Sequence, residues 1–482
     1  MQQVGESSAN FTARTGVTDE AAKAAKSRKL AEKRAVREAQ EAERLRRPSR
    51  KSRRIEGKAV EVETPLVFER KQRESSQTRT RPPTISKRRE LGDEGRAFLR
   101  DIVGDVEERE MTAPDALDQV EYSLSADDVV APTQEKINSL AFLPRADRIV
   151  VACGDNAGYV ALWSPSDEGS GVKQENPAAR MVTYQPHLRP MSQLLFAEPT
   201  KLLSASRDGS VRVFDLNAAT YSTVYQSSSK SPLRSLAASS TRQCYYAGCD
   251  DGGLRVIDVR ARPQTEKLRL HTAAINSVHQ HPSLDQCIVT ASADSTVSIW
   301  DARKLTYLST PLLQLHGHSN SVSCAYFSPH DGAWLVTVGL QSRHNYSCFS
   351  TPARSFTINV HDTSAFTSDT TTITWDASIR IHHRTRRKLQ AAWDPKRPNL
   401  FAIGSLAQPL RTQIFRSDSA QPVREFVSDN FDNVTSVHAF HPHLELIAGC
   451  ADDASGKLAL WRGKKATADD EPKVKAEKRE VA

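Results

Sequence analysis

Between about residues 116 and 462, short apolar segments alternate with polar turn residues at nearly regular intervals. The clearest copy of this pattern runs from Ile275 to Arg303, INSVHQHPSLDQCIVTASADSTVSIWDAR. It has a first apolar segment, a His-Pro turn, the apolar run CIVTAS, an Ala-Asp-Ser turn and a third segment that ends in Trp-Asp. Apolar segments of this length, separated by turn residues, predict short β-strands. The pattern therefore predicts an all-β domain made of repeats.

Seven segments of the chain align on this copy. Their first strands are predicted to begin near residues 137, 191, 233, 275, 321, 388 and 434, which gives spacings of 54, 42, 42, 46, 67 and 46 residues. Four-stranded blades of the WD40 type repeat every 40 to 45 residues, roughly. The sequence therefore predicts a seven-bladed WD40 β-propeller over residues 116–462. Because the tail at residues 463–482 is charged, we expect the strand that closes the ring from VEYSLS at residues 120–125.

The fifth segment is longer than the others and accounts for the spacing of 67 residues. The stretch LQSRHNYSCFSTPARSF, from Leu340 to Phe356, stands where a short turn is expected between the second and third strands. Two explanations are open: an inserted surface loop, and an unspliced intron translated in the gene model. A transcript that contains these codons in most reads would exclude the second explanation.

Residues 1–115 contain few aromatic and β-branched residues, and we expect them to form a disordered arm. Within the arm, residues 19–47 are rich in Ala, Glu, Lys and Arg, begin with acidic residues and end before Pro48. These features predict a helix that is solvated on its own or forms on binding. We expect the tail at residues 463–482 to be disordered as well.

The positive charge of the chain is concentrated in the arm. The whole chain has 66 Lys and Arg and 58 Asp and Glu residues, a net charge of +8, whereas residues 21–60 alone have 15 and 5, a net charge of +10. A localised basic segment indicates a polyanionic partner, most often nucleic acid. A solvated tail and a nuclear import signal are the alternatives. The basic residues predicted to contact DNA here are Arg46, Arg47, Arg50, Lys51, Arg53 and Arg54.

A second basic run lies in the predicted propeller, within SIRIHHRTRRKLQ. Such a run can neutralise several phosphates of DNA, and two basic residues in the following turn extend it. The alternative explanation is that these are solvated charges on an outer strand. The predicted DNA-binding residues of this second run are Arg380, Arg384, Arg386, Arg387, Lys388, Lys396 and Arg397. Two more bases, Arg189 and Arg207, also fall in predicted loops.

The sequence lacks the motifs that mark several classes of function. The chain has no P-loop, no G-x-S-x-G elbow and no H-E-x-x-H motif, so we do not expect an enzyme. The seven cysteines form no C-x-x-C pair, which argues against a disulfide framework and a zinc module, and we expect most of them to be buried in strands. We expect no cofactor and no metal. Without a signal peptide or an apolar spanning segment, the chain is expected to be intracellular and soluble.

Five segments carry a more specific resemblance: LLSASRDGSVRVFD, TASADSTVSIWDARKL, HSNSVSCAYFSP, AAWDPKRPNLFAIGSLAQP and HPHLELIAG. In this order, over residues 137–461, they resemble the changed-mutation-rate family of DNA-damage-binding WD40 proteins of fungi, which has a vertebrate WD-repeat counterpart. The fourth segment is the most specific, and the run RRPSRKSRRI also looks like the basic segment before the propeller in this family. The resemblance implies a nuclear protein that binds single- or double-stranded DNA, prefers ultraviolet-damaged sites and acts in the DNA damage response.

The end of the opening copy suggests a second function. Trp300, Asp301 and Arg303 match the W-D-x-R box by which some propellers resemble receptors for the adaptor of cullin-4 ubiquitin ligases, and Asp258 with Arg260 is a partial second copy. The Trp and Asp are otherwise expected to be blade framework. The alternative to a DNA-binding protein is therefore a protein-interaction scaffold, or a substrate receptor of such a ligase, with chromatin proteins as partners.

Overall fold

The computed structural model divides the chain into two compact units, residues 1–78 and residues 79–482. All the residues that the structure describes belong to the second unit. The predicted helix at 19–47, the basic run from Arg46 to Arg54 and the tail beyond residue 465 lie outside them. The described residues are 84–85, 93–104, 116–165, 180–227, 231–239, 244–258, 268–307, 309–341, 355–366, 383–384, 389–405, 409–431 and 433–465.

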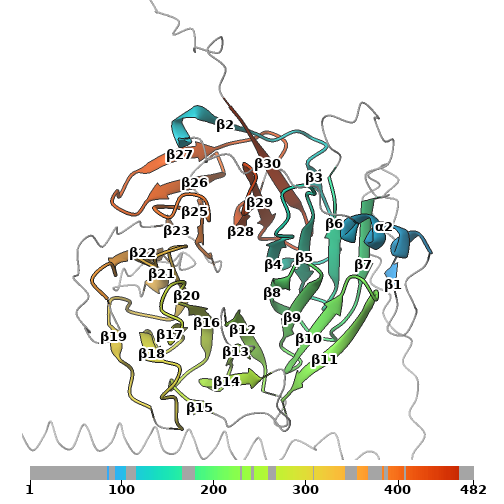
Figure 1. Ribbon diagram of the computed structural model, residues 1–482. Coiled ribbons are helices and arrows are strands. Elements are labelled where there is room, and N and C mark those ends of the chain that lie inside the picture. Colours follow the sequence, from blue (N-terminus) through green and yellow to red (C-terminus); the bar gives the residue numbers. More distant parts are fainter. Residues whose placement is uncertain are drawn as a thin grey trace, which may run out of the picture. The chain divides into compact units, whose positions relative to one another are not determined.

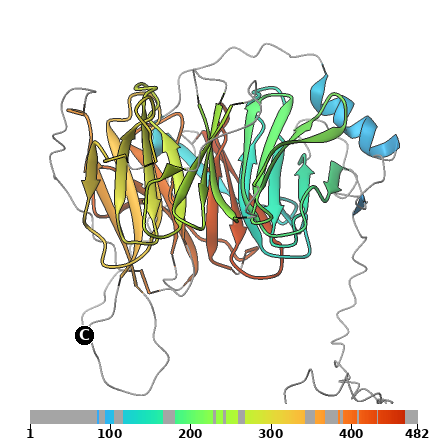
Figure 2. The same ribbon diagram turned by 90° about the horizontal axis from the view of Figure 1, so that it is seen from below.

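Seven sheets, whose blade strands are antiparallel, follow one another around a ring (Figure 1, Figure 2). Blade 1 contains β4 (Ile137–Phe142), β5 (Val151–Asp155), β6 (Val160–Trp163) and β7 (Met181–Tyr184). Blade 2 contains β8 (Met191–Glu198), β9 (Lys201–Ser206), β10 (Ser210–Asp215) and β11 (Thr220–Gln226). Blade 3 contains β12 (Leu233–Ala238), β13 (Cys244–Cys249), β14 (Gly253–Asp258) and β15 (Leu268–Arg269).

The other four blades repeat this order. Blade 4 contains β16 (Ile275–Gln280), β17 (Cys287–Ser292), β18 (Val297–Asp301) and β19 (Leu313–Leu315). Blade 5 contains β20 (Val322–Phe327), β21 (Trp334–Gln341), β22 (Ser355–Asp362) and β23 (His383–Arg384). Blade 6 contains β24 (Ala392–Trp393), β25 (Leu400–Ser405), β26 (Arg411–Arg416) and β27 (Pro422–Phe426). Blade 7 begins with β28 (Thr435–Phe440), β29 (Leu446–Ala451) and β30 (Leu458–Lys465). The predicted seven-bladed WD40 propeller is confirmed.

The ring is closed by the predicted N-terminal segment. After a 3-10 turn, η2 (Leu117–Gln119), the strand β2 (Val120–Ser123) pairs antiparallel with β30 and becomes the outer strand of blade 7. The short β3 (Val129–Val130) pairs with the other end of β30, and the Arg462 guanidinium donates to the Asp128 carboxylate at 2.8 Å beside it. Because both ends of the domain join one sheet, the ring has no open gap and β30 is not left as an edge strand.

Part of the N-terminal region is ordered, which corrects the expectation of a disordered arm over residues 1–115. The strand β1 (Thr84–Ile85) pairs in parallel with β7, and the helix α2 (Asp93–Val103) packs at the outer side of blade 1 (Figure 1, Figure 2). Leu99 and Ile102 are buried there. The Arg145 guanidinium donates to the carbonyl oxygens at the end of α2, including Gly104 O at 3.0 Å. The helix has four large apolar residues, Phe98, Leu99, Ile102 and Val103, that pack in an apolar cluster with blades 1 and 2. The sequence does not reveal their packing, because their partners lie in the propeller.

Blade 5 contains the unusual stretch of residues 340–356. Its strands β21 and β22 pair along their whole length, from Trp334 opposite Asp362 to Gln341 opposite Ser355. Both ends of the stretch therefore belong to strands of the blade, and its middle, residues 342–354, lies outside the described residues. The choice between an inserted loop and a translated intron stays open.

Neighbouring blades are joined near the centre by side chains of their first strands. Ser139 Oγ accepts a bond from Leu194 N at 2.8 Å, Ser277 Oγ from Ala325 N at 2.9 Å, and Gln193 Oε1 from Leu236 N at 3.1 Å. These bonds satisfy backbone amides that point toward the preceding blade. Apolar clusters fill the space between the sheets, and the six described cysteines are buried there with free thiols, as expected.

Candidate nucleic-acid interface

The strand order gives the ring two distinct faces. The upper face, as we define it, carries the connection from each blade to the next and the turn between the second and third strands of each blade. The lower face carries the other two turns of each blade. Function in a propeller depends on which side chains these connections project, because the strands form a common scaffold.

Two upper-face segments of blade 2 lie against each other. One is the connection of residues 185–190 from β7 to β8, and the other is the turn of residues 207–209 from β9 to β10. Arg207 N donates to Pro190 O at 3.0 Å, and Ser206 Oγ donates to the carbonyl oxygens of Arg189 and Pro190, both at 3.1 Å. The backbones of Arg189 and Arg207 are therefore held side by side.

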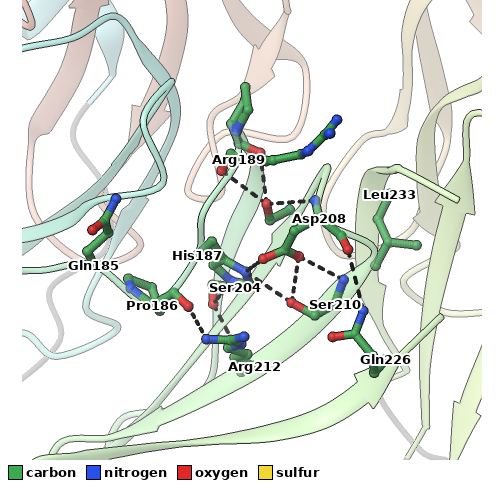
Figure 3. Close-up of polar contacts among 12 residues, drawn as sticks. Gln185, Pro186, His187, Arg189, Ser204, Asp208, Ser210, Arg212, Gln226 and Leu233 are labelled. Atoms are coloured by element: carbon green, nitrogen blue, oxygen red, sulfur yellow. Dashed lines mark hydrogen bonds and ion pairs between the residues drawn. The ribbon is translucent and has the colours of Figure 1, made fainter. Parts of the chain in front are cut away.

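A buried polar network fixes these two segments (Figure 3). His187 is fully buried, with Nδ1 at 2.9 Å from Asp208 Oδ2 and Nε2 at 2.8 Å from Ser204 Oγ. Ser210 Oγ donates to Asp208 Oδ1 at 2.6 Å. Burial lowers the pKa of His187, so the ring is neutral at pH 7 and its Nδ1–H donates to the carboxylate. Burial would raise the pKa of Asp208, but bonds from His187 and Ser210 outweigh it and lower that pKa to about 2.

Both arginines next to this network have exposed side chains. Figure 3 shows the Arg189 guanidinium pointing away from the His187–Asp208 bonds. Among the residues that the structure describes, neither guanidinium has a hydrogen-bond or ion-pair partner. Partial burial and the nearby charge of Arg234 lower the pKa of Arg207, and the carboxylate of Asp250 offsets part of this effect. Arg189 and Arg207 are thus exposed cations on a fixed backbone, and neither guanidinium is hydrogen-bonded or ion-paired within the described part of the chain.

Two further basic residues come from the adjoining blades. Arg234, near the start of β12, pairs with Asp250 and donates to Asn276 Oδ1 at 3.1 Å. Lys136, just before β4, pairs with Asp452. Together with Arg207 they line one upper-face hollow of about 130 Å³. The upper-face basic cluster, as we call Lys136, Arg189, Arg207 and Arg234, therefore spans blades 1 to 3. Lys136 and Arg234 line it as paired charges, and Arg189 and Arg207 provide its unpaired ones.

Comparison with known proteins supports the identity of the repeats. The family model described as WD domain, G-beta repeat matches residues 262–301 and 309–343. The chain is a WD40-repeat protein. It is 32% identical over 351 residues to WD repeat-containing protein 76 of Rhinolophus ferrumequinum, which covers 70% of the chain and 51% of that protein. It is also 28% identical over 355 residues to DNA damage-binding protein CMR1 of Phaeosphaeria nodorum, which covers 68% and 65%.

These relatives confirm the resemblance to the changed-mutation-rate family and its vertebrate counterpart. A third relative, WD repeat-containing protein 76 of Mus musculus, is 32% identical over 335 residues, or 68% of the chain and 49% of that protein. The WD40 protein described here spans about half the length of the vertebrate relatives it matches.

Lys396 and Arg397 were predicted to contact DNA, and the structure gives them another role. They lie on the lower face, in the turn between β24 and β25, and their side chains are 7% and 9% exposed. Lys396 Nζ donates to Leu444 O at 2.9 Å, and Arg397 pairs with Asp394 and Glu445, both at 2.8 Å. Their charges join blades 6 and 7, so the prediction is corrected for this pair. A sequence shows the charges but not the partners that neutralise them.

The rest of the second basic run is described only in part. Arg384 lies in β23, where its backbone pairs with Ser355 of β22. Arg380, Arg386, Arg387 and Lys388 lie outside the described residues, as does the basic run of the arm. Their contacts with DNA stay predictions.

The residues predicted to bind an adaptor divide into framework and surface. Trp300 is buried, and its Nε1 donates to Thr290 Oγ1 at 2.8 Å. Asp301 is also buried and accepts bonds from Arg303, whose side chain is 51% exposed on the lower face. Asp258 is exposed at the end of β14, and Arg260 lies outside the described residues. Among the described residues of this set, Arg303 and Asp258 are exposed.

Sequence reasoning missed Lys136 and Arg234. Each lies next to or within the first residues of the first strand in its blade, and this position brings both to the upper face. Basic residues at the start of each predicted blade are the sequence signal that would have identified Lys136 and Arg234. Within the described ranges, no group of three His, Cys, Asp or Glu residues is arranged to hold a metal ion, and no helix has the length and apolarity to cross a membrane.

Proposed function

We propose that this WD40 protein binds DNA through its upper-face basic cluster. The observation that carries the proposal is the pair Arg189 and Arg207, two exposed guanidiniums without a described partner on a backbone fixed by a buried network. Arginine forms bidentate bonds with phosphate, and a fixed position reduces the entropy that is lost on binding. Relatives of the chain are named DNA damage-binding proteins, which supports this proposal.

The cluster and the arm would have different tasks. The basic run from Arg46 to Arg54 would add affinity that depends on salt and not on the state of the DNA, by releasing counterions. The upper face would position the duplex, and a damaged duplex deforms more easily onto a rigid protein surface. We propose that the protein prefers ultraviolet-damaged DNA and acts in the nucleus in the DNA damage response, by binding and without catalysis.

The test of the cluster is a fluorescence titration of a labelled duplex with the full chain across a series of salt concentrations. The double substitution Arg189→Ala and Arg207→Ala should weaken binding about tenfold at low salt. It should also reduce the slope of log K against log salt by about 2, as expected for two lost phosphate contacts. Arg303→Ala removes an exposed arginine from the lower face and is the matched control. Equal binding by the double variant and the wild type at every salt concentration would refute the proposal.

The arm is tested by substitution in the full chain. Deleting residues 1–115 would also remove α2, whose Leu99 and Ile102 pack on the propeller, and would confuse the two effects. Replacing the six basic residues predicted to contact DNA, from Arg46 to Arg54, by Gln leaves α2 in place. We expect lower affinity for damaged and undamaged duplex by the same factor, with a flatter salt dependence. A change in the ratio of the two affinities would contradict the division of tasks.

A second candidate function rests on the exposure of Arg303. Its guanidinium is half exposed on the lower face and is oriented by Asp301, so a partner protein can contact it while the upper face holds DNA. This arrangement favours the scaffold alternative, with a cullin-4 ligase adaptor or chromatin proteins as partners. Arg303→Ala should abolish capture of the purified adaptor by the full chain and leave DNA binding unchanged. Lys304→Ala, at a neighbouring position with a 78% exposed side chain, is the control.

A further inference from the structure

Leu188 has an unusual position on the upper face. Its exposed fraction is 62%, the largest among the exposed large apolar residues in the described part of the chain. It stands between His187 and Arg189 in the connection that carries the basic cluster of blade 2. A single exposed leucine is common on protein surfaces. What distinguishes Leu188 is its place next to Arg189 on a backbone that is held on both sides.

The backbone on both sides of Leu188 is clamped. His187 N donates to Gly158 O at 3.3 Å, and the network with Asp208 holds its ring. Gly158 has a φ of +87°, and a Cβ there would lie 2.4 Å from His187 O, so this connection packs directly on the backbone of blade 1 at a position that requires glycine. Arg212 donates to Pro186 O on the preceding side.

The backbone that follows Leu188 is also held in place. Ser206 Oγ donates to the carbonyl oxygens of Arg189 and Pro190, and the two prolines at 186 and 190 restrict the backbone further. Leu188 is therefore the outward tip of a segment whose flanking residues are all bonded. A tip held in this way loses little conformational entropy when it is inserted into a partner.

We propose that Leu188 is a wedge that enters the base stack at a lesion and gives the protein its preference for damaged DNA. This inference rests on the proposed DNA binding by the upper-face basic cluster. Proteins that kink DNA often insert an apolar side chain between base steps, and the bases around a lesion cost less to unstack than those of an intact duplex. Arg189 follows Leu188 in the chain, and Arg207 N is bonded to Pro190 O at 3.0 Å, so both cations stand beside the wedge and would contact the phosphates that flank the opened step.

The test compares two labelled duplexes with the full chain: one with a single thymine photodimer and the same duplex without it. Wild type should bind the first more tightly. Leu188→Ala should reduce the ratio of the two affinities at least about fivefold, with affinity for intact duplex changed less than twofold. Leu188→Met keeps the apolar volume and should retain the ratio. Thr272→Ala, at the matching position of blade 4, is the control.

A fluorescent 2-aminopurine next to the lesion reports unstacking directly. Its fluorescence should rise on binding of wild type and not on binding of Leu188→Ala. An unchanged affinity ratio and fluorescence rise in Leu188→Ala would overturn the wedge while DNA binding by the cluster stands. Equal binding of both duplexes by wild type would overturn the wedge in the same way. Failure of wild type to bind either duplex would overturn the proposed function itself.

Discussion

Blades 2 and 4 share one polar framework at the upper face. In blade 2, His187 Nδ1 lies 2.9 Å from Asp208, and in blade 4, His271 Nδ1 lies 3.0 Å from Asp294. The other ring nitrogen contacts a hydroxyl in both blades, Ser204 at 2.8 Å or Thr290 at 2.7 Å. The framework therefore fixes the connection and the turn of both blades in the same way.

The outward residues on this framework differ. Leu188, Arg189 and Arg207 of blade 2 correspond to Thr272, Ala273 and Ala293 of blade 4. Thr272 is bonded back to the framework, because its N and Oγ1 contact Asp294 Oδ2 at 3.2 and 3.3 Å. The same scaffold thus presents two cations and an apolar tip in one blade and a short neutral surface in the other. Stability belongs to the shared residues, and we assign binding to the residues that differ.

Acid should have the largest effect on both blades. Burial lowers the pKa of His187, and it lowers the pKa of His279 and His281 in blade 4 to about 4. In the unfolded chain these histidines take up protons below about pH 6.5. In the folded chain the lowered pKa delays this for His187, and His279 and His281 stay mainly neutral until the pH approaches 4. Stability should therefore fall as the pH drops from 6.5 to 4, by roughly 5 kcal/mol. Thermal unfolding at constant ionic strength measures this; a melting temperature that is flat or rises over this range would contradict it.

Removal of the framework carboxylate should have the next largest effect. Asp208→Ala and Asp294→Ala each leave a buried histidine and a hydroxyl without their acceptor. We expect each to destabilise the fold by about 3 kcal/mol, because buried polar groups lose their partners. Denaturant unfolding compares the two. A large loss in one blade and none in the other would show that the frameworks are not equivalent.

Conversion of the blade 2 surface to that of blade 4 should have a smaller effect, confined to binding. The triple substitution Leu188→Thr, Arg189→Ala and Arg207→Ala should lower affinity for duplex DNA about 10-fold to 100-fold. The melting temperature should change little, because none of the three side chains is in the core. Titration and thermal unfolding of the same preparation give both numbers. A variant that unfolds early would mean that these residues also stabilise the fold.

The smallest effect is expected at the turn of each blade. Gly209 has a φ of 82° in blade 2, and Ser295 has a φ of 73° at the matching position of blade 4. A side chain in this left-handed region costs about 1 kcal/mol. Gly209→Ser should therefore destabilise the protein by about that amount, and Ser295→Gly should be neutral or slightly stabilising. Changes of the same sign in both variants, measured by unfolding, would contradict this view of the turn.

The architecture could be predicted from sequence because each blade carries its own local pattern. The predicted first-strand starts lie within a few residues of β4, β8, β12, β16, β20, β24 and β28, and VEYSLS closes the ring. The turn residues and the alternation that encode a blade are adjacent in the chain, so no distant information is needed.

The site depended on distant partners and was harder to predict. Lys396 and Arg397 looked like a continuation of a basic run, but Glu445, far along the chain, neutralises them. Arg189 and Arg207 looked like two separate loop residues, and only the folded blade brings their backbones together. In α2, Leu99 and Ile102 are buried only because blades 1 and 2 provide their contacts. Charge counting does not reveal which charges are already paired.

Mapping of the DNA footprint on the full chain shows which face and which blades of the propeller contact the duplex. Hydrogen–deuterium exchange, measured with and without a saturating photodimer duplex, reports each upper-face segment separately. We predict that DNA slows exchange in residues 185–190 and 207–210 of blade 2 and leaves residues 271–274 and 293–296 of blade 4 unchanged. Protection of the blade 4 segments or of the lower face, with blade 2 unchanged in a saturated complex, would contradict the assignment of DNA binding to the upper-face basic cluster.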